Sequence, residues 1–195
     1  ERKDTRKTVP IEEAKKAYSP ALSDKIHVIP QGFDYSNINI DKNFKGNSIP
    51  YFAYAGVVYQ GYRDPANFLK YLCTLDYDFR FIVYTRNDSV FRLYKDQLGE
   101  KMVIKNYIPR DSLLFELSRM DFLINLVNNN SVQSPSKLID YYLTERPILD
   151  ISTVFNEKSD FDNFINRNYE SKRKVVDIEQ YNISNVGNKF LNLYR

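Results

Sequence analysis

The chain has 195 residues, of which 43% are hydrophobic and 15% aromatic, enough for one substantial domain with its own core. Its net charge of +3 is small, and basic and acidic residues are interspersed, so a dedicated nucleic-acid surface with a basic stripe is not expected. One cysteine excludes an internal disulfide framework and fits a reducing compartment, and with a single histidine it leaves too few ligands for a His/Cys zinc site.

The N-terminal part contains short elements separated by turns and loops. A helix is predicted over residues 10–18, a short strand over 26–29 and a polar loop over 36–48. His27 lies inside the strand-like run, which favours a structural role over membership of a catalytic triad. The charged first residues, without an initiating Met, predict that the sequence is part of a longer protein.

From residue 49 onward, strands and helices alternate with short connections. Strands are predicted over 49–55, 79–85, 102–104, 122–126 and 147–151, and helices after Asp64, over 88–98, around Leu113 and after Ser134. Several strands are almost continuously apolar, which is typical of a parallel sheet covered on both faces. The alternation predicts an α/β fold, a Rossmann-like, doubly wound parallel sheet with three α/β/α layers. Helical spacing over 155–168, a last strand at 175–176 and a helix over 182–194 complete the pattern.

Ligands of doubly wound sheets bind beyond the carboxyl ends of the strands. The loops at these ends are predicted to be 56–63, 85–88, 106–110 and 128–137, and they should converge on one crevice. The first loop begins at Gly56, where a ligand can approach the backbone closely. It does not have the GxGxxG pattern, so alone it is a weak indication of nucleotide binding.

The most informative stretch is QSPSKLIDYY, residues 133–142. Ser134 suits a helix N-cap and Pro135 the first turn. An apolar stripe at i,i+4 spacing then leaves Ser136, Lys137 and Asp140 on another face.

Those three polar residues can be interpreted in two ways. A hydroxyl and an ammonium at a helix start favour an anion, and a carboxylate one turn later could accept hydrogen bonds from a sugar diol. Together these groups suit a nucleotide diphosphate. The alternative is an ordinary exposed i,i+3 ion pair between Lys137 and Asp140.

Three segments carry a resemblance to a known family. Residues 25–34, KIHVIPQGFD, resemble the K-I-x-V-I-P-x-G-x-D segment of retaining GT-B glycosyltransferases of the group-1, or family-4, type. Residues 54–56 with 63–65 are similar to the first strand, glycine loop and helix of their C-terminal domain. Residues 136–148 are similar to their S-x-K-x-x-E-Y…g-x-P-I region. The resemblance implies a donor-binding domain over 25–195, with 1–24 a linker from an acceptor domain absent from this chain.

By this resemblance the chain is the donor-binding half of a hexosyltransferase-like enzyme of polysaccharide biosynthesis. The enzyme would transfer sugar with retention from a UDP- or GDP-sugar to a glycan or lipid-linked glycan held by the missing domain. No metal or other cofactor is expected, nor activity of this fragment alone. With no membrane-spanning run and no signal peptide in the sequence, we predict a cytoplasmic protein; peripheral contact with the inner face of a membrane is left open for the full-length protein.

The resemblance also assigns binding residues by position. Asp140 corresponds to the ribose-binding acid, Ser136 and Lys137 to the diphosphate-binding helix start, and Gly56 to the loop facing the diphosphate. The remaining candidates are Tyr107 and Ile108, in the loop that meets the base, with Arg63 and Ser134 near the phosphates. Catalytic residues stay unassigned.

Two positions depart from the family pattern. Val132 stands where the first of two glutamates is usual, and Val57 where a basic residue often follows the first glycine. Two alternatives therefore stay open: a non-catalytic nucleotide-sugar-binding module and a GT-B-like nucleotide-sugar epimerase.

Overall fold

The computed structural model describes residues 25–27, 29–58, 61, 63–127 and 137–194. These residues form two compact units. The larger unit contains described residues from 36 to 127 and from 137 to 176, and the smaller contains those from 25 to 35 and from 177 to 194. Each unit is described by itself.

The larger unit is built on a five-stranded parallel sheet, as the sequence predicts. Its strands are β1 (Tyr51–Ala55), β2 (Arg80–Tyr84), β3 (Met102–Lys105), β4 (Phe122–Leu126) and β5 (Ile148–Ile151), in the order β3-β2-β1-β4-β5. Ala53 is paired with Ile82 of β2 on one side and with Leu123 of β4 on the other. The order of strands reverses between β1 and β4, which is where ligands bind in sheets of this type.

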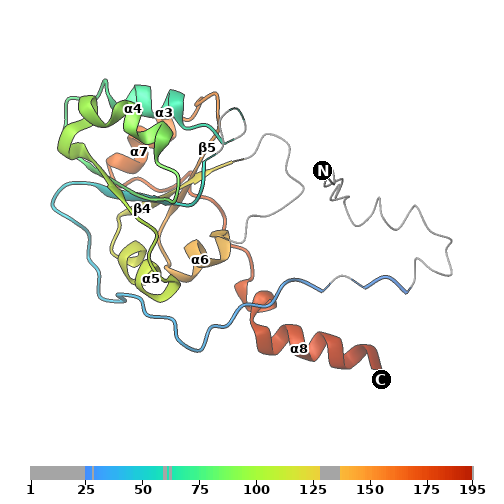
Figure 1. Ribbon diagram of the computed structural model, residues 1–195. Helices are drawn as coiled ribbons and strands as arrows, with labels where there is room; N and C mark the ends of the chain where they lie inside the picture. Colours follow the sequence, from blue (N-terminus) through green and yellow to red (C-terminus); the bar gives the residue numbers. More distant parts are fainter. Residues whose placement is uncertain (1–24, 28, 59–60, 62, 128–136, 195) are drawn as a thin grey trace. The chain divides into compact units, whose positions relative to one another are not determined.

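Helices cover both faces of the sheet and give the predicted three layers. Figure 1 shows α3 (Ala66–Leu72), α4 (Ser89–Leu98) and α7 (Lys158–Ile165) on one face, with α5 (Arg110–Ser118) and α6 (Lys137–Leu143) on the other. A 3-10 turn, η1 (Gly99–Lys101), joins α4 to β3. Every residue of β4 is buried because layers lie on both sides of it.

Stacked phenylalanine rings fill the core between the sheet and the layer that contains α3 and α7. Phe52 stacks on Phe81 of β2 at a ring-centroid distance of 5.0 Å and on Phe122 of β4 at 4.8 Å. Phe161 of α7 meets the Phe52 ring edge-on at 5.4 Å. Rings on three neighbouring strands thus fix the sheet register and hold α7 against it.

The smaller unit is held together by backbone contacts around Phe33. Its C-terminal part contains η2 (Ile178–Tyr181), α8 (Ile183–Leu191) and η3 (Asn192–Tyr194), in agreement with the predicted helix over 182–194. The Phe33 N–H donates to Tyr181 O at 2.7 Å, and the Ile183 N–H donates to Phe33 O at 2.9 Å. The Asn182 side chain caps α8 by accepting from Ser184 N.

Two predicted strands are wrong. Of the predicted strand 26–29, the described residues 26, 27 and 29 have no strand structure, and the bridge in this part of the chain is made by Phe33. Residues 175–176 are also outside any strand, and Val175 is 66% exposed. The nearby Arg173 N–H donates to Ile148 O at 2.8 Å, and one such bond does not make a ladder. The predicted helix over 10–18 lies outside the described residues.

The phenylalanine stack should account for a large part of the stability of the larger unit. Phe52 is fully buried among aromatic rings, so Phe52→Ala should lower the free energy of unfolding by about 3–5 kcal/mol in urea denaturation. Leu93→Ala is the control, because Leu93 of α4 is 76% exposed and should cost about 0.5 kcal/mol or less. A similar loss in both variants would contradict the assignment of Phe52 to the central core.

Candidate functional site

A cavity of about 310 Å³ lies at the carboxyl end of the sheet in the larger unit. It brings together residues from three predicted loop and helix positions: Gly56 after β1, Tyr107 and Ile108 after β3, and Lys137 and Asp140 on α6. The sequence places these residues far apart, and the parallel order β3-β2-β1-β4 brings their elements to one edge. Leu113 and Leu117 of α5 give the cavity an apolar wall.

Gly56 allows the chain to turn tightly at the end of β1. Its φ of +148° is one that residues with a side chain rarely adopt, and its N–H donates to Tyr84 O at 2.9 Å. A Cβ placed there would lie 3.0 Å from the Tyr54 hydroxyl oxygen, which itself donates to Val57 O at 3.0 Å. The turn is therefore fixed against the Tyr54 ring with no room for a larger residue.

Tyr141 joins α6 to the end of β1. Its hydroxyl oxygen accepts from the Ala55 N–H at 2.7 Å and lies 3.3 Å from Ala55 O, to which it donates. Burial raises the pKa of Tyr141 above its ordinary value, so the hydroxyl keeps its proton. The same contact sets the side chain of Lys137 against Gly56, where a Cβ would lie 3.8 Å from Lys137 Cδ.

Lys137 holds a buried ammonium group at the cavity. The residue as a whole is partly exposed, but its Nζ is buried and has no hydrogen-bond partner among the described residues. Nζ lies 4.6 Å from the centroid of the Tyr54 ring and 5.8 Å from that of Tyr141, close enough for cation–π attraction.

The charge state of Lys137 follows from this environment. Burial, with a smaller contribution from the nearby positive charge of Arg63, lowers the pKa of the Lys137 ammonium to about 7, against the opposing effect of Asp150. Two aromatic faces offset only part of the cost of burying a cation. An anion in the cavity would supply the missing compensation.

Asp140 is held by an arginine that sequence reasoning did not single out. Arg110 Nε donates to Asp140 Oδ1 at 2.7 Å, with 35% of the arginine side chain and 23% of the aspartate side chain exposed. Burial raises the pKa of Asp140, and Arg110 opposes that rise. The alternative of an exposed Lys137–Asp140 ion pair is therefore wrong, because the Lys137 ammonium is buried and Asp140 pairs with α5.

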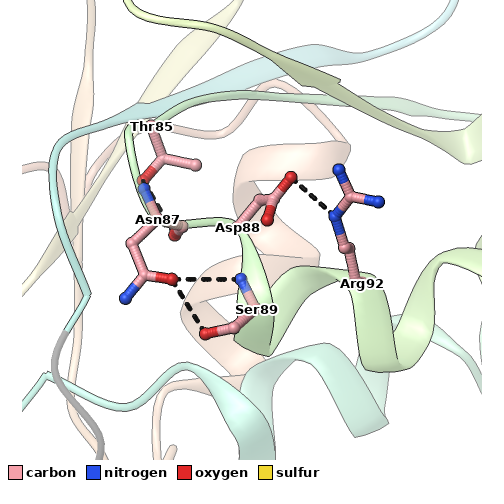
Figure 2. Close-up of polar contacts among 5 residues, drawn as sticks. All are labelled: Thr85, Asn87, Asp88, Ser89 and Arg92. Atoms are coloured by element: carbon pink, nitrogen blue, oxygen red, sulfur yellow. Dashed lines mark hydrogen bonds and ion pairs between the residues drawn. The ribbon is translucent and has the colours of Figure 1, made fainter.

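The loop after β2 is stabilised by hydrogen bonds from its own side chains and contributes Thr85 and Arg86 to the cavity. As Figure 2 shows, Thr85 Oγ1 accepts from Asn87 N at 3.1 Å, and Asn87 Oδ1 accepts from Ser89 N at 3.2 Å. These bonds start α4 at Ser89, one residue later than the sequence predicts. The Arg86 guanidinium lies 4.3 Å from the centroid of the Tyr107 ring, which is 59% exposed at the rim of the cavity.

The other predicted site positions have different outcomes. Arg63 does not line the cavity, although its charge affects Lys137. Ser134, Ser136 and Val132 lie outside the described residues, and the described part of α6 begins at Lys137. Val57 lines the cavity, so the position that often carries a basic residue in the family is apolar here.

Sequence reasoning missed Arg86 and Arg110, and each had a usable signal. Arg86 follows the predicted strand 79–85 directly, and Arg110 closes the loop 106–110, so both belong to loops predicted to face the crevice. The sequence does not show which residues of different elements come into contact, and this contact places Arg110 of α5 beside Asp140 of α6.

Two features are absent from the described part of the chain. No group of three or more His, Cys, Asp or Glu side chains gathers there in a way that could hold a metal ion. No helix in the described part of the chain has both the length and the apolar character needed to cross a membrane.

Among known proteins, this chain is similar to solved structures but not to any family model or curated sequence. No protein-family model and no curated protein matches the sequence. Among solved structures, TarM matches with a TM-score of 0.55 at 13% identity, over 83% of this chain and 38% of TarM. A structure of a single-residue mutant of S. aureus TarM in complex with fondaparinux, alpha-GlcNAc-glycerol and UDP matches with a TM-score of 0.54 at 14% identity, over 90% of this chain and 41% of that chain.

TarM is a retaining GT-B glycosyltransferase of family 4, and this chain spans about two fifths of the TarM chains it matches. The larger unit therefore has the Rossmann-like fold of a GT-B domain, which confirms the predicted fold class and the structural resemblance to that family. At this level of identity the likeness establishes the fold alone.

The buried Lys137 ammonium should destabilise the empty protein in a pH-dependent way. Its pKa is lowered on folding, so the unfolded chain binds more protons between pH 7 and about 10.5, and stability should rise with pH across that window. At pH 6 Lys137→Met should raise the free energy of unfolding by about 1–4 kcal/mol, and the gain should shrink toward pH 10.

Chemical denaturation at pH 6, 8 and 10 measures this effect. Lys70→Met is the control, since Lys70 is exposed on α3 and its replacement should change stability by about 0.5 kcal/mol or less at any pH. A Lys137→Met variant that is less stable than the wild type at pH 6 would show that the ammonium has partners that compensate its burial.

Proposed function

We propose that this chain is the donor-binding domain of a GT-B glycosyltransferase and that its cavity holds a nucleotide-diphosphate sugar. The observation that carries the proposal is the buried Lys137 ammonium, which faces the cavity at the point where the strand order reverses and has no hydrogen-bond partner among the described residues. A buried cation without a partner needs an anion, and a diphosphate supplies one.

The diphosphate is proposed to lie between the Gly56 turn and Lys137. Without a side chain at Gly56, phosphate oxygens can come close to the backbone, and the Lys137 side chain already packs against that turn. The described part of α6 has only seven residues, so the proposal rests on the ammonium group and not on the helix terminus.

The nucleoside is proposed to extend from Lys137 toward α5. Asp140 lines the cavity one turn further along α6 and can accept hydrogen bonds from the ribose diol. Beyond it, Tyr107 and Ile108 with the apolar side chains of Leu113 and Leu117 form a wall suited to a flat base. One cavity thus offers a cation, a diol acceptor and an apolar wall in the order in which a nucleotide diphosphate needs them.

In a retaining transfer the nucleotide diphosphate is the leaving group. As the bond to the sugar breaks, negative charge builds on the diphosphate, and a positively charged Lys137 in a water-poor site would stabilise it. Acceptor binding, for a glycan or a lipid-linked glycan, is proposed to belong to the other half of such an enzyme. UDP- and GDP-sugars are the proposed donors, and the TarM structure that contains UDP favours the first.

A binding panel tests this proposal. Isothermal titration of the chain with UDP, GDP, ADP, uridine and guanosine should show binding of UDP or GDP that is much tighter than that of the matching nucleoside. Lys137→Met should weaken the diphosphate at least about tenfold, since it removes a charged hydrogen bond, and should leave the nucleoside within about twofold.

The control is Lys70→Met, which should bind every compound as the wild type does. Absence of binding by any diphosphate would overturn the proposal. An equal effect of Lys137→Met on UDP and uridine would overturn the phosphate role of this residue.

A further inference from the structure

The ion pair between Arg110 and Asp140 links α5 to α6 and also fixes the orientation of the Asp140 carboxylate. Arg110 Nε donates to one carboxylate oxygen of Asp140, Oδ1, and the other oxygen, Oδ2, accepts no hydrogen bond from the described residues. Asp140 lines the cavity, whereas Arg110 does not. The arginine therefore holds the carboxylate from outside the cavity and leaves one carboxylate oxygen available to a ligand inside it.

We propose that Arg110 is a positioning residue, which fixes the Asp140 carboxylate so that its second oxygen binds the ribose diol of the nucleotide. This inference rests on the proposed function, because it gives Arg110 a role only if a nucleotide occupies the cavity. Arg110 is not proposed to touch the ligand.

The location of Arg110 indicates a purpose other than helix stability. It is the first residue of α5, where the positive end of the helix disfavours a cation, and the acidic residue of that turn, Asp111, is the one that suits this end. Asp140 on α6 supplies the opposite charge across the helix pair. A partly exposed ion pair of this kind adds only about 0–1 kcal/mol to stability, which leaves room for a role in binding.

Two physical effects would follow from the contact. An aspartate fixed in one orientation loses less freedom when a ligand binds, so more of the hydrogen-bond energy remains as affinity. Arg110 also opposes the rise in the pKa of Asp140 that burial causes, and so favours the charged form, which can only accept hydrogen bonds.

The same contact fixes the loop before α5. Tyr107 and Ile108 line the cavity, and Arg110 follows them after a single proline. Anchoring Arg110 to Asp140 therefore ties the loop proposed for the base to the residue proposed for the ribose.

Isothermal titration of four proteins tests the inference: the wild type, Arg110→Gln, Arg110→Lys and Arg92→Gln. Each is titrated with UDP and 2′,3′-dideoxy-UDP, and in parallel with GDP and 2′,3′-dideoxy-GDP. Arg92 is the matched control, because its Nε makes an ion pair of the same length, 2.7 Å, with Asp88 on the exposed face of α4. Melting temperatures of all four proteins establish that each variant is folded.

Arg110→Gln should weaken the ribonucleotide about tenfold and the dideoxynucleotide less than about twofold, since only the ribonucleotide has the diol. Arg110→Lys should recover most of the loss, because an ammonium can make the single contact that Nε makes. Arg92→Gln should leave both affinities unchanged. These three results together would support the positioning role.

Other outcomes would overturn it in distinguishable ways. Equal weakening of both nucleotides by Arg110→Gln, with wild-type binding intact, would reduce Arg110 to a structural contact and leave the proposed function standing. Unchanged affinity of Arg110→Gln for both nucleotides would likewise overturn the positioning role and leave the proposed function standing. Failure of the wild type to bind UDP or GDP would overturn the proposed function and this inference with it.

Discussion

The ammonium group of Lys137 lies inside the larger unit with the rings of Tyr54 and Tyr141 on two sides and no hydrogen-bond partner among the described residues. A charge in this position is costly, and burial accordingly lowers the pKa of Lys137 to about 7. The two rings are nevertheless held in place by hydrogen bonds. The Tyr141 hydroxyl is hydrogen-bonded to the end of β1, and the Tyr54 hydroxyl to the turn that follows β1. Such a site makes physical sense if an anion completes it.

The fold explains how this arrangement arises from distant parts of the chain. The order of strands reverses between β1 and β4, so the turn at Gly56 and the helix that carries Lys137 come to the same edge of the sheet. The stack of Phe52, Phe81 and Phe122 keeps these strands in register deep in the core. The core that stabilises the larger unit is therefore separate from the cavity, and the stability of this core can offset the cost of burying Lys137.

Sequence patterns were sufficient for the scaffold because they are local. Continuous apolar runs such as Tyr51–Ala55 identify buried strands, and the i,i+4 stripe on α6 identifies its buried face. They failed at 26–29 and 175–176, where β-branched residues occur without a neighbouring strand to complete a ladder. At the cavity, Gly56, Tyr107 and Lys137 could be predicted to lie together because their loops follow strand ends, and all three line it. Spacing on one helix, however, gave the wrong partner for Asp140. The true partner, Arg110, is 30 residues away and becomes visible only in three dimensions.

The most direct test of the proposed anion site is the number of protons taken up when a nucleotide diphosphate binds. Titration with UDP at pH 8, repeated in buffers of different ionisation enthalpy, measures that number. Lys137 should be mostly neutral in the empty cavity and charged beside the diphosphate, so the wild type should take up about one proton for each UDP bound, and Lys137→Met none. Binding of UDP to the wild type without proton uptake would contradict the claim that the anion compensates the buried ammonium.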